Sequence, residues 1–143
     1  MDNASETRTP ATPDEIRTRI RSEHAQISAM VARVEALTER VGPHEPKSIV
    51  ALRDELQSLG NLLMEHLHYE EYQLPTLAKE GDADSVAEAM RAEHKGQREL
   101  LHGIIRDLDE TAVGEKLVTG VRELARAIRD DMEQEERELL SKP

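Results

Sequence analysis

The sequence predicts an all-α fold, an up-down-up-down antiparallel four-helix bundle, and three observations lead to it. Apolar residues recur at helical spacing in four long segments. The 143-residue chain contains no Phe and no Trp, so its core has to be built from Leu, Ile, Val, Met and Ala, which suits packed helices better than a sheet. The breaks between the segments are short, and short connections between long helices make neighbouring helices antiparallel.

The first predicted helix, over residues 13–40, begins at a capping box. In Thr12-Pro13-Asp14-Glu15 the Thr hydroxyl can accept from the Glu amide, Pro occupies a position that the first turn tolerates, and two acids face the positive end of the helix. The preceding residues 1–11 are polar and rich in Thr and Ser, which is typical of a disordered tail. We therefore expect an N-terminal tail over 1–11 and a single domain, the bundle, over 12–143.

Three further helices are expected after short breaks, over 46–79, 84–110 and 114–141. The breaks are Gly42-Pro43-His44-Glu45-Pro46, Gly81-Asp82-Ala83-Asp84 and a weaker one from Thr111 to Gly114. Placing residues about 100° apart around each axis locates one apolar stripe per helix. In chain order the four stripes consist of Ile16, Ile20, Ile27, Val31 and Val34; Leu52, Leu56, Leu59, Leu63 and Leu77; Val86, Met90, Leu101, Ile105 and Leu108; and Leu117, Val121, Leu124, Ile128 and Leu139.

The charge balance and the missing residue types exclude several functional classes. With 30 acidic against 19 basic residues and only two Tyr as aromatic residues, the chain offers neither a positive face for a phosphate backbone nor a platform for stacked bases. The absence of Cys excludes disulfides, Fe–S clusters, thiolate zinc sites and a Cys nucleophile. No apolar run approaches the roughly 20 residues of a membrane span, and Met1 to Pro13 lacks the hydrophobic stretch of a secretory signal. We expect a cytoplasmic helical domain without nucleic-acid or membrane partners, whose metal chemistry would use His, Asp and Glu.

Every expected helix interrupts its apolar stripe with a side chain that can bind a metal. These side chains are His24 in the first helix, His66 and Glu70 in the second, His94 in the third, and Asp131 and Glu135 in the fourth. They lie early to midway in the helices that run one way and late in those that run the other way, so an up-down bundle brings them into one layer near one end. Unpaired carboxylates in an aliphatic core cost several kcal/mol each, and a cluster of cations would compensate for that cost.

The chain also repeats itself. Arg21-Ser22-Glu23-His24 recurs as Arg91-Ala92-Glu93-His94, and His66-x-x-x-Glu70-Glu71-x-x-Leu74-Pro75 is matched by Asp131-x-x-x-Glu135-Glu136-x-x-Leu139-Leu140. The i,i+4 spacing places two side chains on one face of a helix, where both reach the same centre. Two helical hairpins with such matching elements predict a pseudo-twofold site between them, which is the logic of di-iron bundles.

On these residues the sequence resembles the hemerythrin-like, His-His-Glu cation-binding family over roughly residues 14–141. The segment from His66 to Pro75, HLHYEEYQLP, is close to the second-helix signature of that family, and Glu93-His94 is close to its third-helix signature. The resemblance implies two iron ions with an oxo or hydroxo bridge. Carried over by position, His24 and His66 would bind one iron and His94 the other, while Glu70 and Glu135 would bridge the two.

Two departures from the family pattern bear on function. The family usually has His where this chain has Asp131, and its oxygen-carrying members have a second His where this chain has Arg98. The second iron would therefore be poor in imidazole, and hard anionic oxygen ligands favour the ferric state. Reversible oxygen carriage needs a stable diferrous form, so these departures argue against it.

Other polar residues near the stripes are expected to play smaller parts. Glu71 and Glu136 point away from the stripes and are interpreted as surface charges, and His44, His68 and His102 are interpreted as non-ligating. Asp131 either binds metal or is solvated beside Asp130. Arg98 either pairs with a carboxylate behind the ligands or extends into solvent.

Tyr69 lies about 60° from His66 on the helical wheel and flanks the predicted site. We favour an amphipathic Tyr at a helix interface, with its hydroxyl in water. The next interpretation is a residue behind the ligands that donates a hydrogen bond to a bridging oxygen, and the third is a phenolate ligand.

Our first hypothesis is a non-haem di-iron protein that binds or reacts with a small oxidant, namely dioxygen, peroxide or nitric oxide, and that serves sensing or detoxification rather than oxygen transport. The alternative is a non-enzymatic interaction bundle with a degenerate or single-metal site, motivated by Asp131. A store or buffer of iron or zinc is a weaker third, because ferritin-like sites use Glu-x-x-His spacing and this chain has His-x-x-x-Glu. Catalytic turnover and the protein partner are left open.

Overall fold

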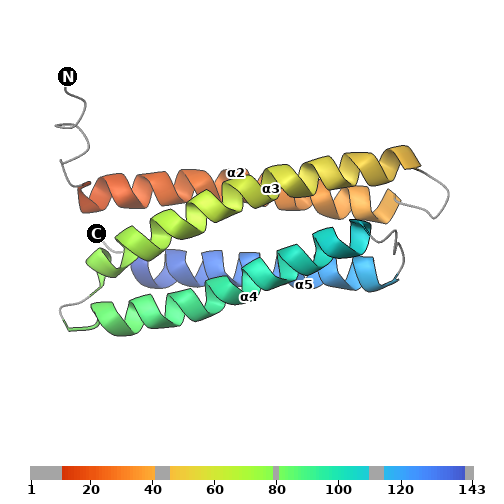
Figure 1. Ribbon diagram of the computed structural model, residues 1–143. Coiled ribbons are helices and arrows are strands. Elements are labelled where there is room, and N and C mark those ends of the chain that lie inside the picture. The colour runs from red at the N-terminus through yellow and green to blue at the C-terminus, as the bar shows by residue number, and fades with distance from the viewer. Residues whose placement is uncertain (1–10, 41–45, 79–80, 110–114, 141–143) are drawn as a thin grey trace, which may run out of the picture.

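The computed structural model describes residues 11–40, 46–78, 81–109 and 115–140. Within them the chain forms four long helices, α2 (Pro13–Arg40), α3 (Pro46–Gln73), α4 (Ala83–Asp109) and α5 (Glu115–Glu135). Helix α2 packs against α3 and α5, and α4 packs against the same two helices, so successive helices are antiparallel neighbours (Figure 1). The predicted all-α four-helix bundle is confirmed.

The structure bears differently on the predicted N-terminal tail and on the expected absence of a membrane span. The tail over 1–11 falls almost entirely outside the described residues and stays a prediction, as does its boundary with the domain. Among the described residues, no helix combines the length and the apolar character that crossing a membrane requires.

Helix α2 starts at the predicted capping box. The backbone N–H of Glu15 donates to Thr12 Oγ1 at 3.1 Å, and the backbone N–H of Thr12 donates to Glu15 Oε1 at 2.8 Å. Because the first N–H groups of a helix have no partner within the helix, this reciprocal pair stabilises the N-terminus of α2. The capping prediction is confirmed.

The second helix ends earlier than the predicted residue 79. Helix α3 stops at Gln73 and continues as a 3₁₀ turn, η1 (Leu74–Leu77). Pro75 explains the change, because it lacks the N–H that an α-helix would need there and its ring clashes with the preceding turn. The link to α4 then passes through Gly81, whose φ of 92° lies in the left-handed region that Gly adopts without strain.

The fourth helix is not one regular α-helix up to residue 141. After Glu135 the turn widens into a π-helix, η2 (Glu136–Leu140). The guanidinium of Arg21 on α2 donates to the carbonyl of Leu140, and the Leu140 side chain is fully buried. These contacts hold the widened turn against α2. Such π turns are frequent at functional sites.

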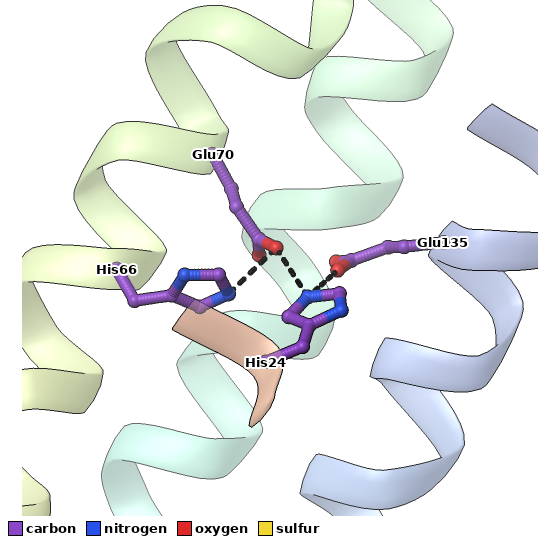
Figure 2. A group of neighbouring side chains, drawn as sticks. All are labelled: His24, His66, Glu70 and Glu135. Atoms are coloured by element: carbon purple, nitrogen blue, oxygen red, sulfur yellow. Dashed lines mark hydrogen bonds and ion pairs between the residues drawn. The ribbon is translucent and has the colours of Figure 1, made fainter. Parts of the chain in front are cut away.

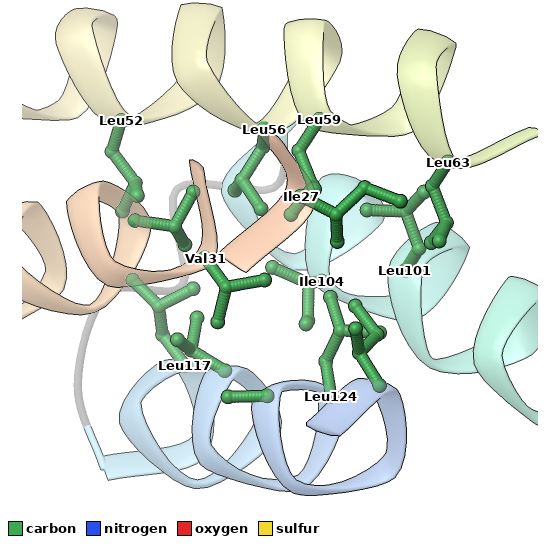
Figure 3. Packing of buried hydrophobic residues seen from close by; sticks show 14 of the residues in the cluster. Ile27, Val31, Leu52, Leu56, Leu59, Leu63, Leu101, Ile104, Leu117 and Leu124 are labelled. Atoms are coloured by element: carbon green, nitrogen blue, oxygen red, sulfur yellow. The ribbon is translucent and has the colours of Figure 1, made fainter. Parts of the chain in front are cut away.

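The apolar core consists of two clusters with a gap between them. The larger cluster fills most of the bundle and includes Ile27, Leu56, Leu63 and Leu124 (Figure 3). The smaller one, near one end, consists of Ile16, Ile20, Leu74, Met90 and Leu140. The metal-binding side chains predicted from the sequence occupy the layer between the clusters, so apolar residues lie on both sides of them.

Most of the predicted stripe residues are buried, with a few corrections. Ile105, Leu77 and Val86 are only partly buried, whereas Ile104 is 3% exposed and belongs to the core. The wheel placed Ile105 on the stripe, but Ile104 takes the buried position between Leu101 and Leu108, at the i+3 spacing that a helical stripe also allows. The side chain of Leu139 lies outside the described residues, and Leu140 takes the buried position at that end.

Candidate metal centre

All six side chains predicted as metal ligands converge in one buried layer. They form two groups of four, His24 with His66, Glu70 and Glu135, and His94 with Asp131, Glu70 and Glu135. In each group, one ligand atom from every residue lies within 4.8 Å of all the others. Glu70 and Glu135 belong to both groups, which gives the pseudo-twofold arrangement that the repeat predicted.

The first group, which we call the His66 set, joins α2, α3 and α5 (Figure 2). His24 Nε2 lies 3.0 Å from Glu70 Oε2 and 3.1 Å from Glu135 Oε1. His66 Nε2 lies 2.7 Å from the same Glu70 oxygen. The i,i+4 spacing of His66 and Glu70 therefore brings both side chains to one point on α3, as expected.

The second group, which we call the Asp131 set, joins α3, α4 and α5. His94 Nε2 lies 3.3 Å from Glu70 Oε1, 3.2 Å from Asp131 Oδ2 and 3.6 Å from Glu135 Oε2. Each of the two shared Glu residues thus directs one oxygen to each set. Asp131 is only 8% exposed and points into this group rather than into solvent.

Several buried atoms at the centre make only the close contacts with one another given above and no hydrogen bond of good geometry, and they test whether metals fit. These atoms are His66 Nε2, Glu70 Oε1, His94 Nε2 and Glu135 Oε2. Leaving a buried polar atom unsatisfied costs about 1–3 kcal/mol, and four around one layer are more than packing alone explains. Imidazole nitrogens and carboxylate oxygens are both metal donors, so these residues fit a pair of cations.

Each imidazole is held from behind by a carboxylate. His24 Nδ1 donates to Glu136 at 2.8 Å, His66 Nδ1 to Glu23 at 2.7 Å, and His94 Nδ1 to Glu71 at 2.8 Å. A carboxylate at the outer nitrogen fixes the tautomer and the ring orientation and makes the inner nitrogen a better metal ligand.

The prediction that Glu71 and Glu136 are surface charges is wrong for Glu71, whose side chain is 18% exposed, and holds for Glu136, which is 48% exposed but still reaches an imidazole. Each follows directly after a shared Glu, and its long side chain reaches the outer nitrogen of an imidazole on another helix. Glu23 has the corresponding role for His66 and was not singled out from the sequence. The repeat contained the signal, because both halves have Glu directly before the ligand His and directly after the shared Glu.

Asp131 is hydrogen-bonded by an amide and a carboxyl group, unlike the imidazoles, which each donate to a carboxylate. The Gln97 side-chain amide, itself 2% exposed, donates to Asp131 Oδ2 at 2.8 Å. Glu93, which matches Glu23 in the repeat, hydrogen-bonds Asp131, and this contact raises the pKa of Glu93 to about 7. The sequence analysis missed Gln97, which is buried on α4 although its residue type gives no signal of burial.

Arg98 and Tyr69 differ in their relation to the centre. The Arg98 guanidinium donates to Glu71 Oε2 at 2.9 Å, and the same oxygen accepts from His94, so Arg98 pairs with a carboxylate behind a ligand. Tyr69 is partly buried, and the Arg19 guanidinium lies 3.8 Å from the centre of its ring. The described structure contains no hydrogen bond from the Tyr69 hydroxyl to a residue of the centre. This agrees with the favoured interpretation of an interface Tyr.

The remaining histidines lie apart from the centre. His68 and His102 are exposed and belong to neither group, and His44 lies outside the described residues.

The electrostatics of the metal-free centre are those of closely packed opposite charges. Burial lowers the pKa of His24, but the carboxylates of Glu135, Glu70 and Glu136 raise it more, to about 10. Burial likewise lowers the pKa of His94, and its contacts with Asp131, Glu135 and Glu70 raise it to about 12.

The carboxylates respond in two directions. Burial raises the pKa of Glu70 and of Asp131, but their imidazole partners lower each pKa to a net value below the ordinary range. Burial raises the pKa of Glu135, and the neighbouring charge of Glu70 brings it to about 9 despite the two imidazoles. In the metal-free protein, protons on the imidazoles and on Glu135 therefore reduce the repulsion between the buried carboxylates, which bound cations would otherwise do.

Comparison with known proteins agrees with this geometry. The family model described as the hemerythrin HHE cation-binding domain matches residues 15–142. No curated protein and no solved structure shows a significant match. The family match spans nearly the whole chain, including every residue of both ligand sets, so the chain belongs to the hemerythrin HHE cation-binding domain family.

Proposed function

We propose that this protein is a non-haem di-iron protein that binds or reacts with a small oxidant, such as dioxygen, peroxide or nitric oxide. The observation that carries the proposal is the sharing of Glu70 and Glu135 between two buried ligand sets. Two carboxylates that each direct one oxygen to each set are the donors that a pair of adjacent metals requires.

The donor chemistry favours iron. Hard carboxylate oxygens combined with imidazole suit iron in its higher oxidation states, and a set with few protein donors leaves positions for an exogenous ligand. The His66 set offers two imidazoles and two carboxylates, and the Asp131 set offers one imidazole and three carboxylates. Zinc is the main competitor, because it accepts four nitrogen and oxygen donors in tetrahedral geometry.

The residues of the chain would position and insulate the centre. When bound, the iron pair would supply Lewis acidity and redox chemistry. Glu136, Glu23 and Glu71 hold the three imidazoles with their inner nitrogens directed at the centre. The two apolar clusters on either side limit the access of water and strengthen every charge interaction between them.

Sensing or detoxification fits the centre better than oxygen transport. The Asp131 set is rich in anionic oxygen, which stabilises the ferric state, and Arg98 stands where carriers have a further imidazole. Neither Phe nor Trp is present to line an oxygen pocket. Placement in the cytoplasm, inferred from composition, is part of the same proposal.

The test is anaerobic reconstitution with ferrous iron, followed by metal analysis and an optical spectrum in air. We expect about two irons per chain and a near-ultraviolet charge-transfer band. His66→Ala should lose iron and the band, whereas His68→Ala on the same helix, whose side chain is exposed, should keep both. Less than one iron per chain in the unmutated protein would overturn the proposal, and a preference for zinc under competition would overturn the choice of iron.

The alternative, an interaction bundle with a degenerate or single-metal site, makes the opposite predictions. In that case His66→Ala would change neither metal content nor function, and a chelator would leave the melting temperature unaltered. The presence of two complete sets of donors, both buried, counts against it.

A further inference from the structure

A small hollow opens to the ligand layer along the seam between α4 and α5. Its volume is about 120 Å³, and its walls include Val86, Met90, Glu93, Asp131, Glu135 and Glu138. A water molecule takes about 30 Å³ of liquid, so the hollow admits a few small molecules but not an organic substrate of drug size.

Of the residues that belong to one ligand set alone, only Asp131 lines the hollow, whereas Glu135 is shared by both sets. The inner wall of the hollow contains Asp131 and Glu135, and Glu135 Oε2 is a buried atom without a hydrogen-bond partner that lies 3.6 Å from His94 Nε2. A second hollow further along the same seam is also bounded by Asp131. None of the three imidazoles of the centre lines either hollow, so Asp131 is the residue that brings one particular set to the seam. The Asp131 set is therefore the one that faces the seam.

The residues that line the hollow disfavour the entry of anionic ligands. Val86 and Met90 are its larger apolar residues, whereas Glu93 on α4 and Glu138 on η2 are exposed acids. A path between carboxylates and apolar groups repels anions and has no cationic group to attract them. A neutral molecule meets no such barrier.

We propose that the exogenous ligand enters through this hollow, that it binds on the side of the Asp131 set, and that it is a small neutral molecule, such as hydrogen peroxide, nitric oxide or dioxygen, rather than an anion. This inference rests on the proposed function and adds to it the direction of access and the charge class of the ligand. The His66 set keeps its apolar surroundings and takes no part in entry.

The first experiment obstructs the hollow. Ala89 is an exposed residue of α4 that lines it, whereas Ala92 is exposed on the same helix and does not. In the iron-loaded protein, Ala89→Trp should slow the association of nitric oxide by about tenfold or more, measured by stopped-flow absorption, and Ala92→Trp should leave the rate within about twofold. Iron content is measured in each variant, because equal content shows that the centre itself is intact.

The second experiment changes the charge at the mouth. Glu138→Lys should speed the association of azide, an anion, by several-fold at low ionic strength and should leave that of nitric oxide unchanged. Glu133→Lys is the matched control, because Glu133 is an exposed acid of α5 that does not line the hollow. The gain for azide should shrink as salt is added, since salt screens the interaction.

The outcomes separate this inference from the proposed function. If the unmutated iron-loaded protein binds neither nitric oxide nor azide, the proposed function fails and the entry route fails with it. If it binds them and Ala89→Trp reacts as fast as Ala92→Trp, the entry route alone is overturned. An equal gain for azide in Glu138→Lys and Glu133→Lys would overturn the selection by charge at this mouth.

Discussion

The side-chain amide of Gln97 donates to Oδ2 of Asp131 at 2.8 Å inside the bundle, and this contact matches the chemistry of the residue that it supports. An imidazole N–H needs an acceptor behind it, and each of the three imidazoles has a carboxylate there. A carboxylate needs a donor instead, and a buried amide supplies one. The surroundings of the centre are therefore suited to Asp131 as it stands, and not only to the His that the family usually has.

Replacing Gln97 tests that fit. Gln97→Met keeps the volume but removes the donor, so Asp131 Oδ2 loses its amide partner and keeps the contact with His94 Nε2 at 3.2 Å. We expect the metal-free protein to lose about 1–3 kcal/mol of unfolding free energy, measured by urea denaturation. Gln57→Met, at an exposed position of α3, is the control and should change little. Equal stability of the two variants would mean that the Gln97 contact contributes nothing measurable.

Glu71→Gln should weaken metal binding without removing a ligand. The Glu71 carboxylate accepts from both His94 Nδ1 and Arg98, and loss of its charge makes the imidazole a poorer donor to metal. We expect an affinity about 10–100-fold lower, measured by competition with a chromogenic chelator. Glu88→Gln, an exposed acid on α4, should bind metal like the unmutated protein. An unchanged affinity in Glu71→Gln would contradict the supporting role.

Asp131→His tests whether residue 131 binds metal. Glu93 lies relative to Asp131 as Glu23 lies relative to His66, so a new imidazole at 131 finds a carboxylate already in place. We expect the iron content to be retained and the charge-transfer band to shift. Adding Glu93→Ala should then lower the iron content, because the new imidazole loses its support. A spectrum identical to that of the unmutated protein would place residue 131 outside the metal ligands.

The metal-free protein should lose stability as pH rises. The pKa of His24 is raised from 6.5 to about 10 and that of His94 from 6.5 to about 12, so their contributions are complete below pH 6.5 and disappear as pH passes those values. The pKa of Glu135, raised from 4.5 to about 9, acts in the same direction. The lowered pKa values of Glu70 and Asp131 act oppositely, but only at acidic pH.

Urea denaturation of chelator-treated protein at pH 6 and pH 9 measures this effect. The midpoint should be lower at pH 9, whereas the increase in melting temperature on metal addition should be larger at pH 9, because fewer protons then compete with the cations. A midpoint that stays level or rises between pH 6 and pH 9 would contradict the assignment of protonated imidazoles to the metal-free centre.

Tyr69→Phe should leave the metal centre unchanged. The ring of Tyr69 packs beneath Arg19 and beside the smaller apolar cluster, and Phe preserves both contacts. Iron content and the optical spectrum should match those of the unmutated protein. A shifted charge-transfer band would instead support a hydrogen bond from the phenol to a bridging oxygen once metal is bound.

The four helical segments, the capped start of α2 and the six side chains that meet in the buried layer were all predicted without coordinates. The physical reason is the 3.6-residue period, which assigns each side chain a direction around its own helix, combined with short connections that set the levels of His24, Glu70, His94 and Glu135 in the bundle. Both properties are local to the chain and can be deduced without coordinates.

What lies behind that layer, and how it is reached from outside, became visible only with the helices packed together. A helical wheel places Glu71 and Glu136 off the stripe, but it does not show that a long side chain crosses to the imidazole of the adjacent helix. The hollow beside Asp131 depends on the space between α4 and α5, which two separate helices create together. These features arise between helices, and the period of one helix carries no information about its neighbour.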